Sequence, residues 1–279
     1  MAPRSYGPFP YSPMTRRTPL KWPNGSRLAL WVIPNVEYFS LEDLPDVMQW
    51  SMRDYGNRVG VFRIMSVLDR YGIRATVALN SDICRHHPEI IEDGLRRRWE
   101  FMGHNRTNTR RLTDLEADEE RVVISESLAT IGDAVGERPA GWLSSGLQET
   151  SRTLELLADE GCQYVCDWTN DDQPYLMTLE SGRTIVSVPY SVELNDKPAF
   201  ERFGRSTAEF EEMICRQFDV LYREGRDSGR VMAIALHPYL TGVPHRIGAL
   251  DRALDYVCRH DGVWLATGGE IAACFSGMA

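Results

Sequence analysis

The stretch LALWVIPNVE, residues 28–37, is an apolar run that ends in the polar residues Asn35 and Glu37. Seven further short apolar runs follow it along the chain, at 75–80, 99–103, 140–143, 164–168, 184–190, 231–237 and 263–267. Most of these runs are apolar throughout rather than alternating, which is typical of strands that are buried on both faces. The pattern therefore predicts a parallel sheet covered on both sides.

Helix-length segments lie between these runs, and several place apolar residues three and four positions apart. The clearest are 59–71, 114–135 and 207–225. Repeated strand–helix units with seven or eight strands indicate a parallel barrel or an open doubly wound sheet. The sequence contains neither a G-x-G-x-x-G nor a G-x-x-x-x-G-K-[ST] loop, so nothing in it supports a nucleotide-binding sheet.

The chain has 279 residues, of which 43% are hydrophobic and 25% charged, and its formal net charge is -9. This composition excludes a disordered protein, and the negative charge makes nucleic acid and anionic membrane surfaces poor partners. No stretch approaches the roughly 20 apolar residues of a membrane span, and the N-terminus lacks the apolar core of a secretory signal. We therefore expect a cytoplasmic protein with reduced cysteines.

The first part of the chain differs from the rest. Residues 1–27 are rich in proline and aromatic residues without any periodicity. They are predicted to form an arm that lies on the body or on a neighbouring subunit. Residues 28–279 are predicted to form a single catalytic domain, and a homo-oligomer (a dimer or tetramer) is expected.

Functional residues of a β/α barrel lie just beyond the C-terminal ends of its strands. His104 and His237 each directly follow an apolar run, and an imidazole exchanges protons near neutral pH. Glu37 follows the first run, where partial desolvation would raise its pKa and suit a general base. The alternative for Glu37 is a salt bridge to Arg58 or another arginine at the rim.

Two further features leave alternatives open. The run 167–172 carries three carboxylates, which indicates either functional groups or a turn capped by its own side chains. A metal site would use Glu37, His104 and Asn108, a poor set for zinc, although a harder cation in an oxygen-rich pocket is compatible with it. No cofactor is favoured, and a divalent metal such as zinc is the alternative.

Several motifs occur in the order found in a known family. They are LALWVIPNVE, GIRATVALN (72–80), GHNRTN (103–108), ERPAGW (137–142) and ALHP (235–238). Over roughly residues 28–270 the chain resembles the polysaccharide deacetylase (NodB-homology) superfamily, which implies an α/β fold with a distorted (β/α)7 barrel. Three more motifs resemble the branch with metal-independent allantoinases and cyclic-imide hydrolases: RDYGNRVG (53–60), NDDQPY (170–175) and HPYLTGVPHRI (237–247).

The sequence departs from the metal-dependent members of that family at their ligand positions. Those members carry an Asp-Asp pair after the first strand and an H-x-x-x-H pair. This chain has Asn35 and Glu37 at the first position, and His104 followed by Asn108 at the second. His237 matches the family's late histidine, which is regarded as the acid. The resemblance therefore implies a metal-free hydrolase that cleaves a C–N bond in an amide, cyclic imide or ureide of a small molecule.

A metal-free reaction requires water activation and stabilisation of the tetrahedral oxyanion. In our hypothesis Glu37 or Asp167 deprotonates the water. Protonated His104 or His237 stabilises the oxyanion or donates to the leaving nitrogen. The candidate substrate-binding residues are Asn35 and Asn108 for the carbonyl, Arg58 for a carboxylate or imide oxygen, Trp142 and Trp168 as apolar walls, and Asp172. Two alternatives remain: a metal-dependent carbohydrate N-deacetylase and a non-catalytic barrel that binds a small ligand.

Overall fold

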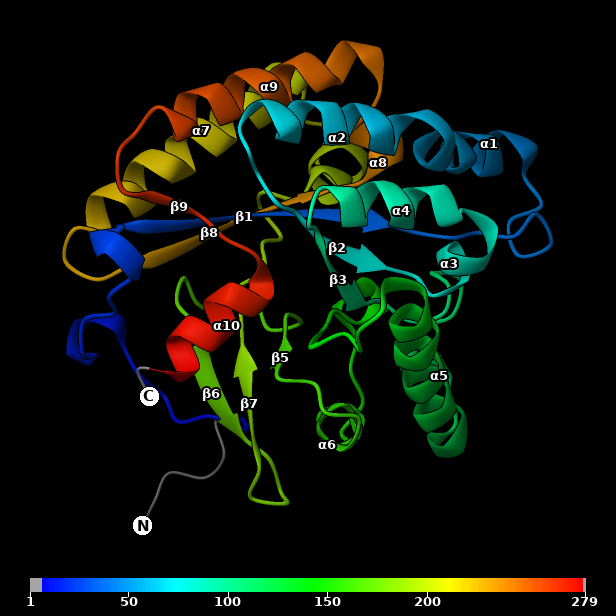
Figure 1. Ribbon diagram of the computed structural model, residues 1–279, viewed down its shortest axis with the longest axis horizontal. Coiled ribbons are helices and arrows are strands. Elements are labelled where there is room, and N and C mark those ends of the chain that lie inside the picture. The colour runs from blue at the N-terminus through cyan, green and yellow to red at the C-terminus, as the bar shows by residue number, and fades with distance from the viewer. Residues whose placement is uncertain (1–6, 278–279) are drawn as a thin grey trace.

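The computed structural model describes residues 7–277, which form one curled, mostly parallel sheet covered by helices (Figure 1). The strand order is β6-β7-β5-β4-β3-β2-β1-β8, with β9 also paired to β1. The strands are β1 (Leu28–Val36), β2 (Thr76–Leu79), β3 (Glu100–Gly103), β4 (Gly141–Trp142), β5 (Tyr164–Val165), β6 (Tyr175–Thr178), β7 (Thr184–Ser187), β8 (Arg230–Leu236) and β9 (Val263–Leu265). The α/β barrel-type fold predicted from the sequence is confirmed.

The α-helices follow the strands in alternation for most of the chain. They are α1 (Val47–Tyr55), α2 (Val61–Arg70), α3 (Asp82–His86), α4 (Pro88–Arg96), α5 (Ala117–Val135), α6 (Thr153–Asp159), α7 (Thr207–Glu224), α8 (Pro238–Thr241), α9 (Pro244–Cys258) and α10 (Gly268–Ser276). Figure 1 shows α2, α7 and α9 in one layer above β1 and β8. None of the helices in the described part of the chain is long and apolar enough to cross a membrane.

Strand β1 shows why the sheet is buried on both faces. Its alternate residues Leu28, Leu30 and Val32 belong to the apolar cluster that includes the inner faces of α2, α7 and α9. Ala29, Trp31 and Ile33 point to the opposite side and join the cluster inside the curl of the sheet. Because side chains alternate across a strand, an apolar run without alternation is what two apolar faces require.

One strand was missed by the sequence analysis. β6 pairs antiparallel with β7, with Tyr175 opposite Ser187. Three of its four residues are at least partly exposed, so it lacks the continuous apolar run by which the other strands were found. An isolated parallel bridge between Asn195 and Ala235 joins the segment after β7 to β8.

The described part of the predicted arm, residues 7–27, lies on the body. The Phe9 ring contacts Trp168 edge-on at a centroid distance of 5.4 Å, and the Trp22 indole donates a hydrogen bond of 2.9 Å to the Arg230 carbonyl. Arg17 forms an ion pair of 2.6 Å with Asp171. The first six residues of the predicted arm lie outside the described residues, and the division into arm and catalytic domain stays a prediction.

Candidate active site

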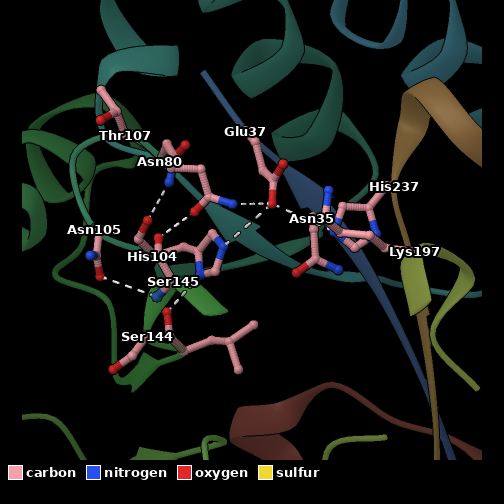
Figure 2. A network of polar contacts seen from close by, with 12 residues as sticks. Asn35, Glu37, Asn80, His104, Asn105, Thr107, Ser144, Ser145, Lys197 and His237 are labelled. Atoms are coloured by element: carbon pink, nitrogen blue, oxygen red, sulfur yellow. Dashed lines mark hydrogen bonds and ion pairs between the residues drawn. The ribbon is translucent and has the colours of Figure 1, made fainter. Parts of the chain in front are cut away.

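Three strands deliver the three central side chains of the site to one cavity of about 340 Å3. Glu37 follows the last residue of β1, His104 follows β3, and His237 follows β8. The parallel ladders place the carboxyl ends of these strands at the same end of the sheet, so residues far apart in sequence meet there. Figure 2 shows Glu37 with His104 on one side and His237 on the other.

Both imidazoles direct Nε2 toward the same carboxylate oxygen. The Nε2 of His237 lies 3.5 Å from Oε1 of Glu37, and the Nε2 of His104 lies 3.9 Å from the same atom. The amide group of Asn108 donates a short hydrogen bond to this oxygen. All three charged or titratable side chains are buried. The site is therefore a carboxylate flanked by two imidazoles.

The His104 ring is held by the backbone. Its Nδ1 lies 2.6 Å from the carbonyl oxygen of Leu143. A carbonyl only accepts hydrogen bonds, so Nδ1 carries the hydrogen and donates it. In the neutral ring this leaves a lone pair on Nε2, the atom that faces the cavity.

The His237 ring is held by a carboxylate instead. Its Nδ1 lies 2.7 Å from Oδ1 of Asp196, which is fully buried. The other oxygen of Asp196 accepts hydrogen bonds from the His237 backbone at 2.8 Å and from the Thr241 hydroxyl at 2.6 Å. Sequence reasoning missed Asp196 because it searched directly beyond the predicted strands, whereas Asp196 follows the isolated bridge residue Asn195, well after β7 ends at Ser187.

These contacts set the charges of the two partners. Burial alone would lower the pKa of His237, but the charges of Asp196 and Glu37 outweigh burial and raise the pKa to about 9. Burial alone would raise the pKa of Glu37, but the charge of His237, together with the contact with His104, outweighs burial and holds that pKa well below its usual range. The expected rise in the pKa of Glu37 is therefore wrong, because its neighbours are cationic or hydrogen-bond donors.

A different arginine from the predicted one lies at the site. Nη1 of Arg53 is 3.7 Å from Oε2 of Glu37, whereas the Arg58 side chain is 71% exposed and lies 3.8 Å from Asp54. Arg53 lies in α1, five residues before Arg58. The alternative of a rim arginine beside Glu37 is thus met by Arg53, and the placement of Arg58 at the site is wrong.

Two glycines of the RDYGNRVG motif explain how Arg53 reaches this position. A π-helical turn, Gly56–Gly60, joins α1 to α2 and rests on α8. A Cβ on Gly56 would lie 2.7 Å from the Tyr239 backbone nitrogen, and one on Gly60 would lie 2.1 Å from the Pro238 carbonyl oxygen. Only glycine permits this close approach, which brings α1 beside the segment that carries His237.

Asn35 and Asn108 both line the cavity, and their binding of a substrate carbonyl stays a prediction. The Asn35 amide donates to the carbonyl oxygens of Ile33 and Leu236, and its oxygen accepts a hydrogen bond of 3.2 Å from Tyr190. Asn108 donates to Glu37 and accepts a hydrogen bond from the Ser145 hydroxyl. Their amides are thus engaged in orienting neighbouring groups.

The remaining candidates do not line this cavity. Trp142 is fully buried in a separate apolar cluster, and Trp168 packs on Phe9 beneath the arm. Asp172 lines a different cavity, near Pro189 and Gln217. Their placement as walls or ligands of the site is wrong, because none of these three side chains is among those that line the cavity beside Glu37.

Asp167 lies behind the site rather than in it. Its Oδ1 accepts a hydrogen bond of 2.7 Å from the Ser144 backbone. Burial, together with the charge of Asp167, raises the pKa of the adjacent Glu149 to about 10, so this carboxyl pair retains a proton. Asp167 is also not among the residues that line the cavity from which a base would act.

The side chains do not fit the metal alternative. Asn108 turns its NH2 group toward Glu37, since a carboxylate only accepts, and its oxygen faces Ser145. Across residues 7–277 no three His, Cys, Asp or Glu side chains are grouped so that they could hold a metal ion. A catalytic zinc requires three such ligands converging on one point.

Part of the chain matches a known protein family, and two related sequences cover most of its length. Residues 44–165 match the family model described as polysaccharide deacetylase. A putative polysaccharide deacetylase of Schizosaccharomyces pombe is 26% identical over 238 residues, which cover 80% of this chain and 74% of that protein. A peptidoglycan deacetylase of Helicobacter pylori is 22% identical over 84% of this chain and 89% of its own.

Two solved structures superpose closely on the whole domain. Puue allantoinase gives a TM-score of 0.83 at 26% identity and covers 92% of both chains. A putative polysaccharide deacetylase from Mycobacterium smegmatis gives 0.84 at 25% identity and covers 94% of both. The family match over residues 44–165, the relatives and these superpositions confirm the resemblance to the polysaccharide deacetylase superfamily that the motifs carry.

Proposed function

We propose that this chain hydrolyses a C–N bond in a small amide, cyclic imide or ureide by general acid–base catalysis, without a bound metal. The observation that carries the proposal is that the two imidazoles beside Glu37 are held at Nδ1 by different groups. His104 is held by a carbonyl and offers a lone pair, whereas His237 is held by Asp196 and carries a proton. A base and an acid thus face each other across one cavity.

The reaction follows from these protonation states. Water attacks the substrate carbonyl while Nε2 of His104 accepts its proton, and Nε2 of His237 then donates a proton to the leaving nitrogen. A C–O bond forms and the C–N bond breaks. Glu37 stays ionised, because its pKa is held low, and stabilises the imidazolium formed at His104. Glu37 therefore acts through the imidazoles rather than as the base expected from the sequence.

The size and chemistry of the site favour an activated small substrate. The cavity of about 340 Å3 lies at the small end of ligand sites, which span roughly 300–1,000 Å3. General acid and base groups each contribute roughly 10²–10⁴-fold to a rate. A strained or electron-poor ring amide needs less activation than a plain acetamide, so cyclic imides and ureides fit this machinery best.

A substrate screen with two variants tests the proposal. Purified protein is assayed on cyclic ureides, cyclic imides and acetylated sugars, each with and without a chelator. We expect turnover of a ring amide that the chelator does not change, and loss of turnover in Glu37→Gln and His237→Ala, with circular dichroism confirming that both fold. A fully active double variant would contradict the mechanism.

The same screen separates the alternatives. Chelator-sensitive release of acetate from sugars would favour a metal-dependent carbohydrate N-deacetylase. Failure to hydrolyse any compound would favour a barrel that only binds a ligand. The homo-oligomeric state and the cytoplasmic location stay predictions, for which light scattering and fractionation are the measurements.

A further inference from the structure

Arg53 is mostly buried against two aromatic rings, and two of its guanidinium nitrogens lack a hydrogen-bond partner among the described residues. Its side chain is 18% exposed, and its guanidinium lies between the rings of Phe39 and Tyr239, at 4.3 and 4.8 Å from their centroids. Its Nε and Nη1 atoms are buried without a hydrogen-bond partner in residues 7–277. An unpartnered buried donor costs roughly 1–3 kcal/mol, more when it is charged. Such a group is suited to a ligand that completes it.

The nearest anion does not satisfy Arg53. Oε2 of Glu37 lies 3.7 Å from Nη1, which is beyond hydrogen-bond distance, and Oε2 itself has no hydrogen-bond partner in the described chain. The same carboxylate uses its other oxygen for the imidazoles. Arg53 and the two histidines therefore approach different oxygens of Glu37, and all three line the same cavity.

The charges that line the cavity also favour an anionic ligand. Arg53, Arg111 and Lys197 line it together with protonated His237, and Glu37 is its one lining carboxylate. The protein as a whole has a formal net charge of -9. A locally cationic cavity in an acidic protein concentrates anions and repels cations.

We propose that Arg53 selects substrates that carry a carboxylate beside the scissile amide, an inference that rests on the proposed hydrolase function. The carboxylate binds the guanidinium, and the amide carbonyl then lies between the imidazoles that flank Glu37. Lys197 and Arg111 add long-range attraction from the rim. Charge-assisted hydrogen bonds from a preoriented arginine give geometric selection as well as affinity.

A matched pair of rings tests the selection. Hydantoin and hydantoin-5-acetic acid share the scissile ureide and differ by one carboxylate. We expect kcat/KM to be at least about tenfold higher for the acid, and Arg53→Gln to reduce this preference by about tenfold or more, mainly through KM. Arg53→Lys should restore part of it. Arg216→Gln, an exposed change of equal charge on α7, should leave the preference as it is.

A binding measurement separates this inference from the proposed function. Calorimetry of hydantoin-5-acetic acid with Glu37→Gln, and with Glu37→Gln combined with Arg53→Gln, measures anion binding without turnover. Arg53-dependent binding with no hydrolysis by the unmodified protein would overturn the hydrolase but support the anion site. Equal hydrolysis of both rings that is unaffected by Arg53→Gln would overturn the anion site and leave the hydrolase standing. Neither binding nor hydrolysis would overturn both.

Discussion

His104 and His237 occupy matching positions, each one residue beyond a buried parallel strand, yet their surroundings give them different chemistry. The Nδ1 of His104 meets a backbone carbonyl, which fixes the tautomer without adding a charge. The Nδ1 of His237 meets the buried carboxylate of Asp196, which fixes the ring and, together with Glu37, outweighs burial and raises its pKa to about 9. The comparison teaches that the group behind an imidazole, more than its place on the strand, decides whether it acts as base or acid.

The largest expected effect comes from removing each ring in turn. His104→Ala and His237→Ala should each lower kcat by roughly 10²–10⁴-fold on a ring amide. The two losses should differ in character, because only the acid assists the leaving nitrogen. An amide with an electron-poor aniline leaving group should recover activity in His237→Ala and not in His104→Ala. Equal recovery in both variants would remove the distinction between acid and base.

A smaller effect is expected when only the carboxylate behind His237 is neutralised. His237 must be protonated to act as the acid, so kcat/KM of the unmodified protein should fall as pH rises through about 9. Asp196→Asn removes the charge that favours the imidazolium, so this fall should begin at lower pH, with kcat reduced by roughly 10-fold to 100-fold. The pH–rate profile measures the shift, and Asp167→Asn is the matched buried control. An unmoved alkaline limb would show that Asp196 has only a structural role.

The same interaction predicts a pH dependence of stability. The pKa of His237 is raised on folding, so its contribution is complete below the unfolded value of about 6.5 and is lost as pH rises through about 9. Urea unfolding at several pH values should show this loss in the unmodified protein and much less of it in Asp196→Asn. The same slope in both proteins would contradict the assignment.

The smallest expected effect is at the second contact of Asp196. Thr241→Val keeps the shape of the side chain and removes its hydrogen bond of 2.6 Å to Oδ2. We expect a loss of roughly 0.5–1.5 kcal/mol in the free energy of unfolding, with kcat within a few-fold of the original. Urea unfolding at pH 7 measures the first and steady-state kinetics the second. A loss of kcat as large as that of Asp196→Asn would place Thr241 in the acid's own network.

The strand-end rule found the central residues of the site from the sequence. Glu37, His104 and His237 each directly follow an apolar run, and parallel strands end at the same end of a sheet. Trp142 lies within the run 140–143 and Asp167 follows β5 by two residues, but neither side chain lines the cavity. The rule predicts which end of the sheet a residue occupies and carries no information on where its side chain points.

Residues outside the strand ends could not be found in this way. Asp196 follows the isolated bridge residue Asn195, outside every predicted strand, and its role depends on a 2.7 Å contact with a residue 41 positions later. Arg53 and Arg58 belong to one motif and lie five residues apart. Only the packing of the π-helical turn on α8 decides which of the two side chains reaches Glu37. Strand β6 is half exposed and joins the sheet by pairing with β7.

The sequence by itself determined the buried parallel sheet, the family resemblance and the imidazole–carboxylate cluster, because apolar runs and the residues that end them are local features of the chain. The tertiary structure alone decided the charges of that cluster, since a pKa depends on which groups lie within a few ångströms in space. Asp196 behind His237, and the two histidines around Glu37, are contacts between segments that meet only when the sheet curls.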